Sequence, residues 1–332
     1  MKKIATVLVL FAAILTMTVV SAYSQAEVFS TETETFSIDP GGLVLVESDD
    51  GYITVESWDR NEVEVIMKKR AWGRNKRDAE RNLEDINIDI VRRGNNLYIR
   101  DVTDNNIRVR VGILDLLRGR TRFGTSVSFE IRLPKQMNLD LNTDDGDIRV
   151  SNVEGDFDFD VDDGDIFLFD SKGSRIEVNI DDGDVRFENI NRLHQNSAST
   201  ITITCDDGEI FLRDVDVESI DLNVDDADVY FVNVSFKNLT ADLDDGDFDA
   251  DIVVQKDGRI RIWNDDGTIE LRMPEQLDAY LNLFAYSGRI RTNYPVKVER
   301  DEGESWVRER LRNGNIDIRI ETTDGDIYIR HR

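Results

Sequence analysis

Residues 156–168 read Asp-Phe-Asp-Phe-Asp-Val-Asp-Asp-Gly-Asp-Ile-Phe-Leu, and this stretch decides the fold. Apolar and acidic residues alternate on both sides of the Asp-Asp-Gly, which predicts two strands that each bury one face. Glycine accepts positive φ at no steric cost and aspartate hydrogen-bonds nearby backbone amides, so Asp-Asp-Gly indicates a sharp corner between the strands. One unit of this chain is therefore strand, turn, strand.

The unit recurs through most of the chain. Successive turn positions are mostly about 18 to 21 residues apart, a period typical of stacked repeats. Inward apolar residues align at equal offsets from each turn, which favours one coil. The alternative is a string of antiparallel hairpins, whose extra turns could come from Gly155, Gly173 and residues 189–191. The repeated turn positions are Gly51, Gly146, Gly164, Gly183, Gly208, Ala227, Gly246, Gly267, Gly288 and Gly325.

The fold class predicted from this pattern is all-β. We expect a single-stranded, β-helix-like β-solenoid of about 8–10 short turns, in which each turn rests on its predecessor. An N-terminal β-rich cap with one short helix should precede it, because the first hundred residues break the rhythm. The expected organisation is a signal peptide over 1–24, the cap region over 25–135 and the solenoid over 136–332.

Three segments interrupt the strand pattern. Residues 76–85 are rich in helix formers and place their apolar side chains on one face, which predicts the helix of the cap. Residues 107–124 are basic and interrupted by glycine, so they are expected to form an irregular excursion or loop. Residues 301–312 are a charged insertion, interpreted as helical, that should help cover the terminal turn.

The N-terminus indicates export. Lys2 and Lys3 precede an apolar run over 4–20 and then small and polar residues, the pattern of a secretory signal peptide. Cleavage after Ser24 or Ala26 would leave no membrane span. An uncleaved anchor is the alternative, because the run is at the lower limit of a bilayer-spanning length. We expect an exported protein that is periplasmic, on the cell surface or secreted.

The charge of the chain is acidic and uneven. A formal net charge of −27 repels nucleic acid and anionic lipid, so neither is an expected partner. Residues 68–125 contain 15 Lys or Arg against 8 Asp or Glu, whereas residues 140–251 contain 7 against 33. This basic front and acidic middle make self-association an alternative function. Cys205 is the only cysteine, which excludes an intramolecular disulfide, and its place in an apolar alternation predicts burial.

Residues that catalysis needs are scarce. His194 and His331 are the only histidines, and the sequence has no histidine–cysteine metal spacing, nucleophile elbow or phosphate-binding loop. Paired carboxylates of the kind that glycosidases use recur in every turn, and such repetition indicates a structural role. We therefore predict that the protein is not an enzyme, with a carbohydrate-active enzyme as the weaker alternative.

One aspartate of each turn is expected to stack on the next. Strands in a sheet lie about 4.8 Å apart, so these carboxylates would form a ladder of like charges. A hard cation such as Ca²⁺ would relieve the repulsion, but solvated aspartates that cap the turn backbone need no cation, and this second interpretation is favoured. No cofactor is therefore expected. The candidate cation ladder is Asp145, Asp163, Asp182, Asp226 and Asp245.

A second row of residues should point away from the core. These residues stand three positions after a turn glycine or its equivalent, and several are aromatic or arginine. Such a row is either an exposed interaction surface or cross-strand packing that stiffens the sheet. The candidate interaction surface is Phe167, Arg186, Phe211 and Tyr230.

Several motifs together resemble a known family. They are the early Asp50-Gly51-Tyr52-Ile53-Thr54-Val55, a strand that ends in Leu133-Pro134, and a ladder of Gly-Asp-Ile or Gly-Asp-Val units at Gly146, Gly164, Gly183 and Gly325. The chain resembles the bacterial putative-adhesin family of β-strand repeat proteins, a toast-rack-like domain of unknown function. The resemblance implies an exported toast-rack-like β-solenoid. We expect a non-enzymatic, adhesin-like binding or scaffold module at the cell envelope, whose partner is an envelope or surface protein or a glycan.

Overall fold

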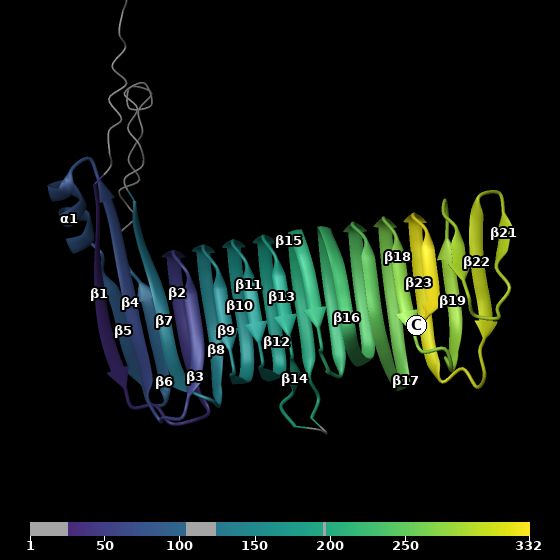
Figure 1. Cartoon of the computed structure of the whole chain (residues 1–332), viewed down its shortest axis with the longest axis horizontal. Helices are drawn as coiled ribbons and strands as arrows, with labels where there is room; N and C mark the ends of the chain where they lie inside the picture. The colour runs from purple at the N-terminus through teal and green to yellow at the C-terminus, as the bar shows by residue number, and fades with distance from the viewer. Residues whose placement is uncertain (1–25, 104–123, 195–196) are drawn as a thin grey trace, which may run out of the picture.

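The protein forms a long, narrow β-solenoid with two sheet faces (Figure 1). The computed structural model describes residues 26–103, 124–194 and 197–332. The predicted signal peptide (1–24) and almost all of the predicted excursion (107–124) lie outside these described residues.

Each coil of the middle region gives one strand to each face, and equivalent strands of successive coils pair in parallel. On the first face Phe159 lies beside Val178, and on the second face Ile166 lies beside Val185. This pairing confirms the coil and excludes the string of hairpins. The first face contains β2 (Gly42–Asp50), β8 (Met137–Asp145), β10 (Glu154–Asp163) and β12 (Lys172–Asp182).

The second face is built from shorter strands. It contains β3 (Ile53–Trp58), β9 (Ile148–Ser151), β11 (Ile166–Phe169) and β13 (Val185–Glu188). The two-residue β14 (Asn191–Arg192) follows in the chain and pairs with the first residues of β12. Further along, three long strands continue round the corners and serve both faces. They are β15 (Thr200–Arg213), β16 (Ser219–Asp245) and β17 (Phe248–Asp266).

The core fills the space between the two faces. Alternate residues of each strand point inward, and Phe159, Val161, Ile180 and Val224 are at most 2% exposed. Burying each such side chain contributes roughly 1.5–3 kcal/mol. Cys205 lies in the same inward row, beside Ile180, and is buried as predicted. The inward positions read from the alternation are therefore confirmed.

Two kinds of corner turn the chain within a coil. At the first, the glycine of Asp-Asp-Gly has positive φ, as at Gly183 (φ +151°). At the second, between a short strand and the next long strand, an Asn or Asp takes the left-handed conformation, as at Asp170 (φ +49°) and Asn189 (φ +58°). From the sequence, a turn at residues 189–191 was considered only for the hairpin alternative, and the left-handed corner of the coil was not predicted. Ala227 stands in a glycine slot without positive φ, inside the continuous strand β16.

A β-rich cap covers the N-terminal end of the solenoid (Figure 1). Its helix α1 (Lys76–Glu84) begins after Asn75, whose side chain accepts a hydrogen bond from the backbone N–H of Asp78 at 3.0 Å, and it confirms the predicted helix. An antiparallel sheet runs β1–β4–β7, and a β5–β6 hairpin lies beside β2. The cap strands are β1 (Ala26–Phe36), β4 (Val63–Gly73), β5 (Ile88–Arg93), β6 (Asn96–Asp101) and β7 (Thr125–Pro134).

The C-terminal coils are not stacked in chain order. In β23 (Ile316–Asp324), Ile318 pairs with Ile260 of β17 on one side and with Leu281 on the other. The last coil therefore lies between two earlier ones, and the C-terminus is found within the row of coils (Figure 1). This corrects the expectation that each turn rests on its predecessor. The other strands of these coils are β18 (Ile269–Met273), β19 (Ala279–Ala285), β20 (Ile290–Thr292) and β24 (Ile327–His331).

The expected helix over 301–312 is wrong. β21 (Glu299–Asp301) and β22 (Glu304–Arg310) form an antiparallel hairpin there, and β22 pairs with β19. Ser305 and Val307 are buried on alternate positions, which is the two-residue period of a strand. The insertion does cover the terminal coil, as expected, but it does so as a hairpin.

Candidate functional site

The four predicted surface residues lie side by side on the outer side of the second face. Phe167 is beside Arg186, Arg186 is beside Phe211, and Phe211 is beside Tyr230. Arg149 extends the row by one strand. Arg149 is exposed and the other four are half-buried. We call these five residues the outer stripe, and the structure brings together every member that the sequence analysis named.

The arginines of the outer stripe lie over its aromatic rings. The guanidinium carbon of Arg149 is 4.5 Å from the ring centroid of Phe167, and that of Arg186 is 4.8 Å from the ring centroid of Phe211. The guanidinium carbon of Arg213, which stands two residues after Phe211 in the chain, is 4.7 Å from the centroid of the same Phe211 ring. Each such contact at an exposed site is worth about 0.5–1 kcal/mol. The stripe therefore stiffens the sheet through cross-strand packing and still presents cationic and aromatic groups to solvent.

Hydrogen bonds fix the polar ends of the stripe. Arg186 donates from Nε to the Glu188 carboxylate at 2.6 Å, and the Tyr230 hydroxyl donates to Asp228 at 3.1 Å. Desolvation, followed by this hydrogen bond to Asp228, raises the pKa of Tyr230 above its usual value. Tyr230 is therefore a neutral phenol at physiological pH. The stripe can offer a ligand aromatic faces, a guanidinium group and carboxylates that orient its arginines.

The predicted aspartate ladder is in register. Asp163 lies beside Asp145 and Asp182, and Asp207 lies between Asp182 and Asp226. Asp207 was left out of the predicted set, although Gly208 directly after it is one of the predicted turn positions. The ladder runs on from Asp245 to Asp266 and then Asp324, which the sequence analysis also left out.

The ladder is a row of repelling charges. The pKa of Asp207 is raised first by desolvation and then by the charges of Asp182 and Asp226. The pKa of Asp245 is raised in the same way, by desolvation and then by the charges of Asp226 and Asp266. Within the described ranges, no group of three or more His, Cys, Asp or Glu is arranged to hold a metal ion. Ca²⁺ binding along the ladder stays a prediction, which melting with and without a chelator tests.

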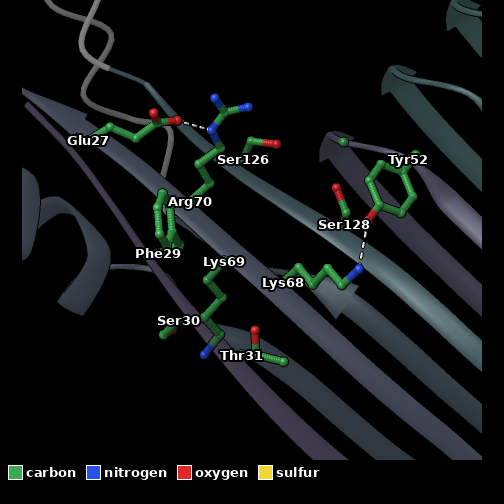
Figure 2. Close-up of a pocket in the computed structure, with 11 residues that line it drawn as sticks. Glu27, Phe29, Ser30, Thr31, Tyr52, Lys68, Lys69, Arg70, Ser126 and Ser128 are labelled. Atoms are coloured by element: carbon green, nitrogen blue, oxygen red, sulfur yellow. Dashed lines mark hydrogen bonds and ion pairs between the residues drawn. The ribbon is translucent and has the colours of Figure 1, made fainter. Parts of the chain in front are cut away.

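The cap carries a shallow groove on the outer side of β1, β4 and β7 (Figure 2). Its volume is about 540 Å³, and Phe29, which is 74% exposed, forms one wall. Its cations are paired with carboxylates: Lys68 with Glu130, and Lys69 with Glu32 at 2.9 Å. The hydrogen bond to Glu130 is the main reason that the pKa of Lys68 is raised. The basic front therefore has much of its charge neutralised at this groove.

The residues that could serve catalysis lie in separate elements. His194 is exposed in the loop after β14, and His331 is exposed at the end of β24. Cys205 lies inside the core, where desolvation and then the nearby aspartates raise the pKa of its thiol to about 12.

A second group of outward aromatic residues was missed by the sequence analysis. It lies on the first face near the C-terminal end, on β17, β19 and β22. The signal for part of it was present, since Tyr280 and Phe284 of β19, and Tyr286 directly after it, follow the outward positions of a strand alternation. The group consists of Trp263, Tyr280, Phe284, Tyr286 and Trp306.

A family model agrees with this architecture. The family model described as Toastrack DUF4097 matches residues 46–330. No curated protein matches the chain.

Several solved structures resemble the chain at low sequence identity. One, described as a putative adhesin from Bacteroides fragilis, is 11% identical, with 90% of this chain and 97% of that chain covered and a TM-score of 0.40. A putative lipid binding protein from Parabacteroides distasonis is 12% identical, with 90% and 96% covered and a TM-score of 0.41. A putative adhesin from Parabacteroides merdae is 12% identical, with 91% and 96% covered and a TM-score of 0.37.

Proposed function

The chain belongs to the Toastrack DUF4097 family, and from this premise we propose that it is a non-enzymatic, adhesin-like binding or scaffold module at the cell envelope. Its partner is an envelope or surface protein or a glycan. The proposal includes export through the N-terminal signal sequence. Among the described residues, no helix combines the length and the apolar character needed to cross a bilayer.

One observation carries the proposal: the outer stripe is continuous across neighbouring coils. Phe167, Arg186, Phe211 and Tyr230 occupy the same outward position of four successive strands. In the same coils, polar and acidic residues occupy the outward rows of the first face, for example Asp158, which lies beside Glu177. A row of aromatic and arginine side chains on an otherwise acidic surface is the composition found at protein interaction sites.

The repetition of the titratable groups supports a binding role over catalysis. Catalysis needs a nucleophile, base or acid whose surroundings differ from those of its neighbours. Here the carboxylates of the first corner recur in register from coil to coil, so the surroundings of each resemble those of the next. A repeating surface suits the recognition of an extended partner instead.

The experiment replaces Phe167, Phe211 and Tyr230 together with serine and measures capture of native envelope components by the purified protein. The triple variant should lose capture while its thermal melting stays cooperative. The matched control replaces Glu177, Thr202 and Asp221, outward residues of neighbouring coils on the first face, with serine. Capture that survives in the stripe variant, or is lost equally in both variants, would contradict the proposal.

Self-association is a second candidate, favoured by the free edge of β1. Among the described strands β1 pairs only with β4, so one edge of an eleven-residue strand is open to a further strand. The basic front and acidic middle of the chain add electrostatic complementarity between copies. Light scattering at low and at high salt tests this candidate, and a monomer under both conditions would remove it.

A further inference from the structure

Outward aromatic residues gather at the C-terminal end of the first face. Trp263 and Tyr286 are 39% and 48% exposed, whereas Phe284 and Trp306 are half-buried. The ring of Phe284 stacks on that of Trp306 at 6.4 Å with an interplanar angle of 16°, and meets that of Tyr286 edge-on at 4.5 Å with an angle of 60°. We call Trp263, Phe284, Tyr286 and Trp306 the C-terminal platform.

The platform begins abruptly along one row of the sheet. In earlier coils the same outward row holds Asn142, Asp160 and Asn179, which face solvent. In the C-terminal coils the same row contains Trp263 of β17, then Glu321 of β23 beside it, and then Phe284 of β19 beside Glu321. Packing of the core does not require this change, because the inward residues alternate as before. An exposed aromatic group on a surface that is otherwise polar indicates a binding site.

Polar side chains with fixed geometry surround the rings. Arg319 donates to the Glu321 carboxylate from Nε at 2.9 Å and from Nη2 at 2.6 Å, which holds Glu321 between Trp263 and Phe284. Asp242 lies beside Trp263 on the other side. A shallow hollow of about 250 Å³ opens between Trp263, Arg319 and Glu321.

This combination of groups fits a sugar chain. A pyranose ring has flat C–H faces that pack on an aromatic ring, and hydroxyl edges that hydrogen-bond to carboxylate, guanidinium and amide groups. Two strand spacings, roughly 9.6 Å, separate the row positions of Trp263 and Phe284. Alternate rings of an extended β-1,4-linked glycan present the same face at a similar repeat.

We propose that the C-terminal platform binds an extended, neutral β-1,4-linked glycan that runs across the strands, along the long axis of the solenoid. The net charge of −27 disfavours an acidic polymer. A peptide would be expected at a free strand edge, where it could pair its backbone, whereas the platform lies on the face of paired strands. The proposal concerns a different face from the outer stripe, so the two can fail independently.

The tryptophans of the chain allow a direct test. Trp58 of β3 and Trp72 of β4 both lie in the N-terminal part of the protein, so a Trp58→Phe, Trp72→Phe protein reports only on Trp263 and Trp306. Cellohexaose and chitohexaose should change the fluorescence of this protein with a saturable dependence on concentration. Maltohexaose, whose α-linked rings do not form a flat ribbon, should have no such effect. No response to either β-1,4-linked sugar, or an equal response to maltohexaose, would overturn the proposal.

Substitutions then locate the site. Trp263→Ala should weaken binding of cellohexaose or chitohexaose about tenfold or more, and Trp263→Phe should keep most of it. Tyr286→Ala serves as a second exposed position if Trp263→Ala loses its cooperative melting. The serine variant of the outer stripe is the matched control and should bind the sugars normally. Affinity that is unchanged in both platform variants would also overturn the proposal.

Discussion

The carbonyl oxygen of Gly164 lies directly against the α-carbon of Gly183 in the next coil, so that a β-carbon on Gly183 would come within 2.0 Å of it. The same relationship joins Gly146 to Gly164 and Gly183 to Gly208. Stacked glycines therefore allow the first corners of successive coils to lie in contact. Ala227 interrupts the column, and it does so with a strand conformation in place of positive φ.

Gly183→Ala should destabilise the solenoid for two reasons. The residue has φ +151°, where an L-amino acid is strained by about 1–3 kcal/mol, and its new methyl group would overlap the Gly164 carbonyl. Urea unfolding followed by circular dichroism should show a lower midpoint. Gly303→Ala is the control, since Gly303 also has positive φ but has no neighbouring atom within 4 Å of an added β-carbon. An equal decrease of the urea midpoint in the two variants would contradict a stabilising role of the close contact between Gly183 and the Gly164 carbonyl.

The aspartate ladder predicts that mild acid stabilises the protein. The pKa values of Asp206, Asp207 and Asp245 are raised, first by desolvation and then by neighbouring aspartates. A raised carboxyl pKa means that the folded state binds more protons, so stability increases as pH falls through the raised value. The melting temperature at low ionic strength should therefore rise from pH 7 toward about pH 5. Added salt at pH 7 should also raise it by screening the repulsion.

Two single substitutions separate this effect from a general response to acid. Asp207→Asn should raise the melting temperature at pH 7 and reduce its pH dependence. Asp278→Asn should lower it, because the backbone N–H of Gly314 and the side chain of Asn315 donate to the Asp278 carboxylate at 2.6 and 2.8 Å. Desolvation opposes these hydrogen bonds, but their combined effect lowers the pKa of Asp278. A fall in stability for Asp207→Asn at pH 7 would contradict the ladder of repelling charges.

The second corner of each coil predicts a different response to alanine and glycine. Asn189 has φ +58°, and its Nδ2 donates to the Asp170 Oδ1 of the previous coil at 2.9 Å. Asn189→Ala should cost about 1–2 kcal/mol because it adds left-handed strain and removes this hydrogen bond. Asn189→Gly removes the hydrogen bond but relieves the strain, so it should decrease the free energy of unfolding by less than Asn189→Ala does. Chemical unfolding of both variants checks the order, and an equal or larger loss for glycine would contradict it.

The sequence predicted the coil well because its signals are local and repeated. Alternation around each Asp-Asp-Gly identified buried residues such as Phe159 and Val224, and equal offsets placed Phe167 beside Arg186. The left-handed corners were not assigned to the coil, and residues 189–191 were considered as a turn only for the hairpin alternative, since a lone Asn or Asp such as Asn189 lacks the recurring tripeptide that marks the first corner. The group around Trp263 was missed because the row continues from Trp263 to Glu321, which is distant in the chain.

The order of the last coils could not be read from the sequence for a physical reason. Each coil presents nearly the same inward apolar residues and the same free backbone edges to either side, so any coil can stack on any other. Ile318 meets Ile260 on one side and Leu281 on the other, and all three are aliphatic. Periodicity alone cannot distinguish this arrangement from stacking in chain order.

Because the last coil lies between two earlier ones, a core substitution in it should destabilise the strands on both sides. Ile318 is fully buried, and Ile318→Ala should cost about 2–5 kcal/mol. Hydrogen exchange should increase in both β17 and β19, because β23 pairs with each. Val307→Ala in β22 is the control, which should affect β19 but leave β17 protected. Unchanged exchange in β19 of the Ile318→Ala protein would contradict the observed order.

Cys205 should be unreactive in the folded protein. Its side chain is 1% exposed, and burial, followed by the charges of Asp206 and Asp207, raises the pKa of the thiol to about 12. The thiolate is the reactive form, so at pH 8 a thiol reagent such as Ellman's reagent lacks both access and a nucleophile. Labelling should be complete within minutes in denaturant and negligible without it. Cys205→Ala, which keeps the site apolar, should fold, whereas rapid labelling of the native protein would show that this part of the core opens to solvent.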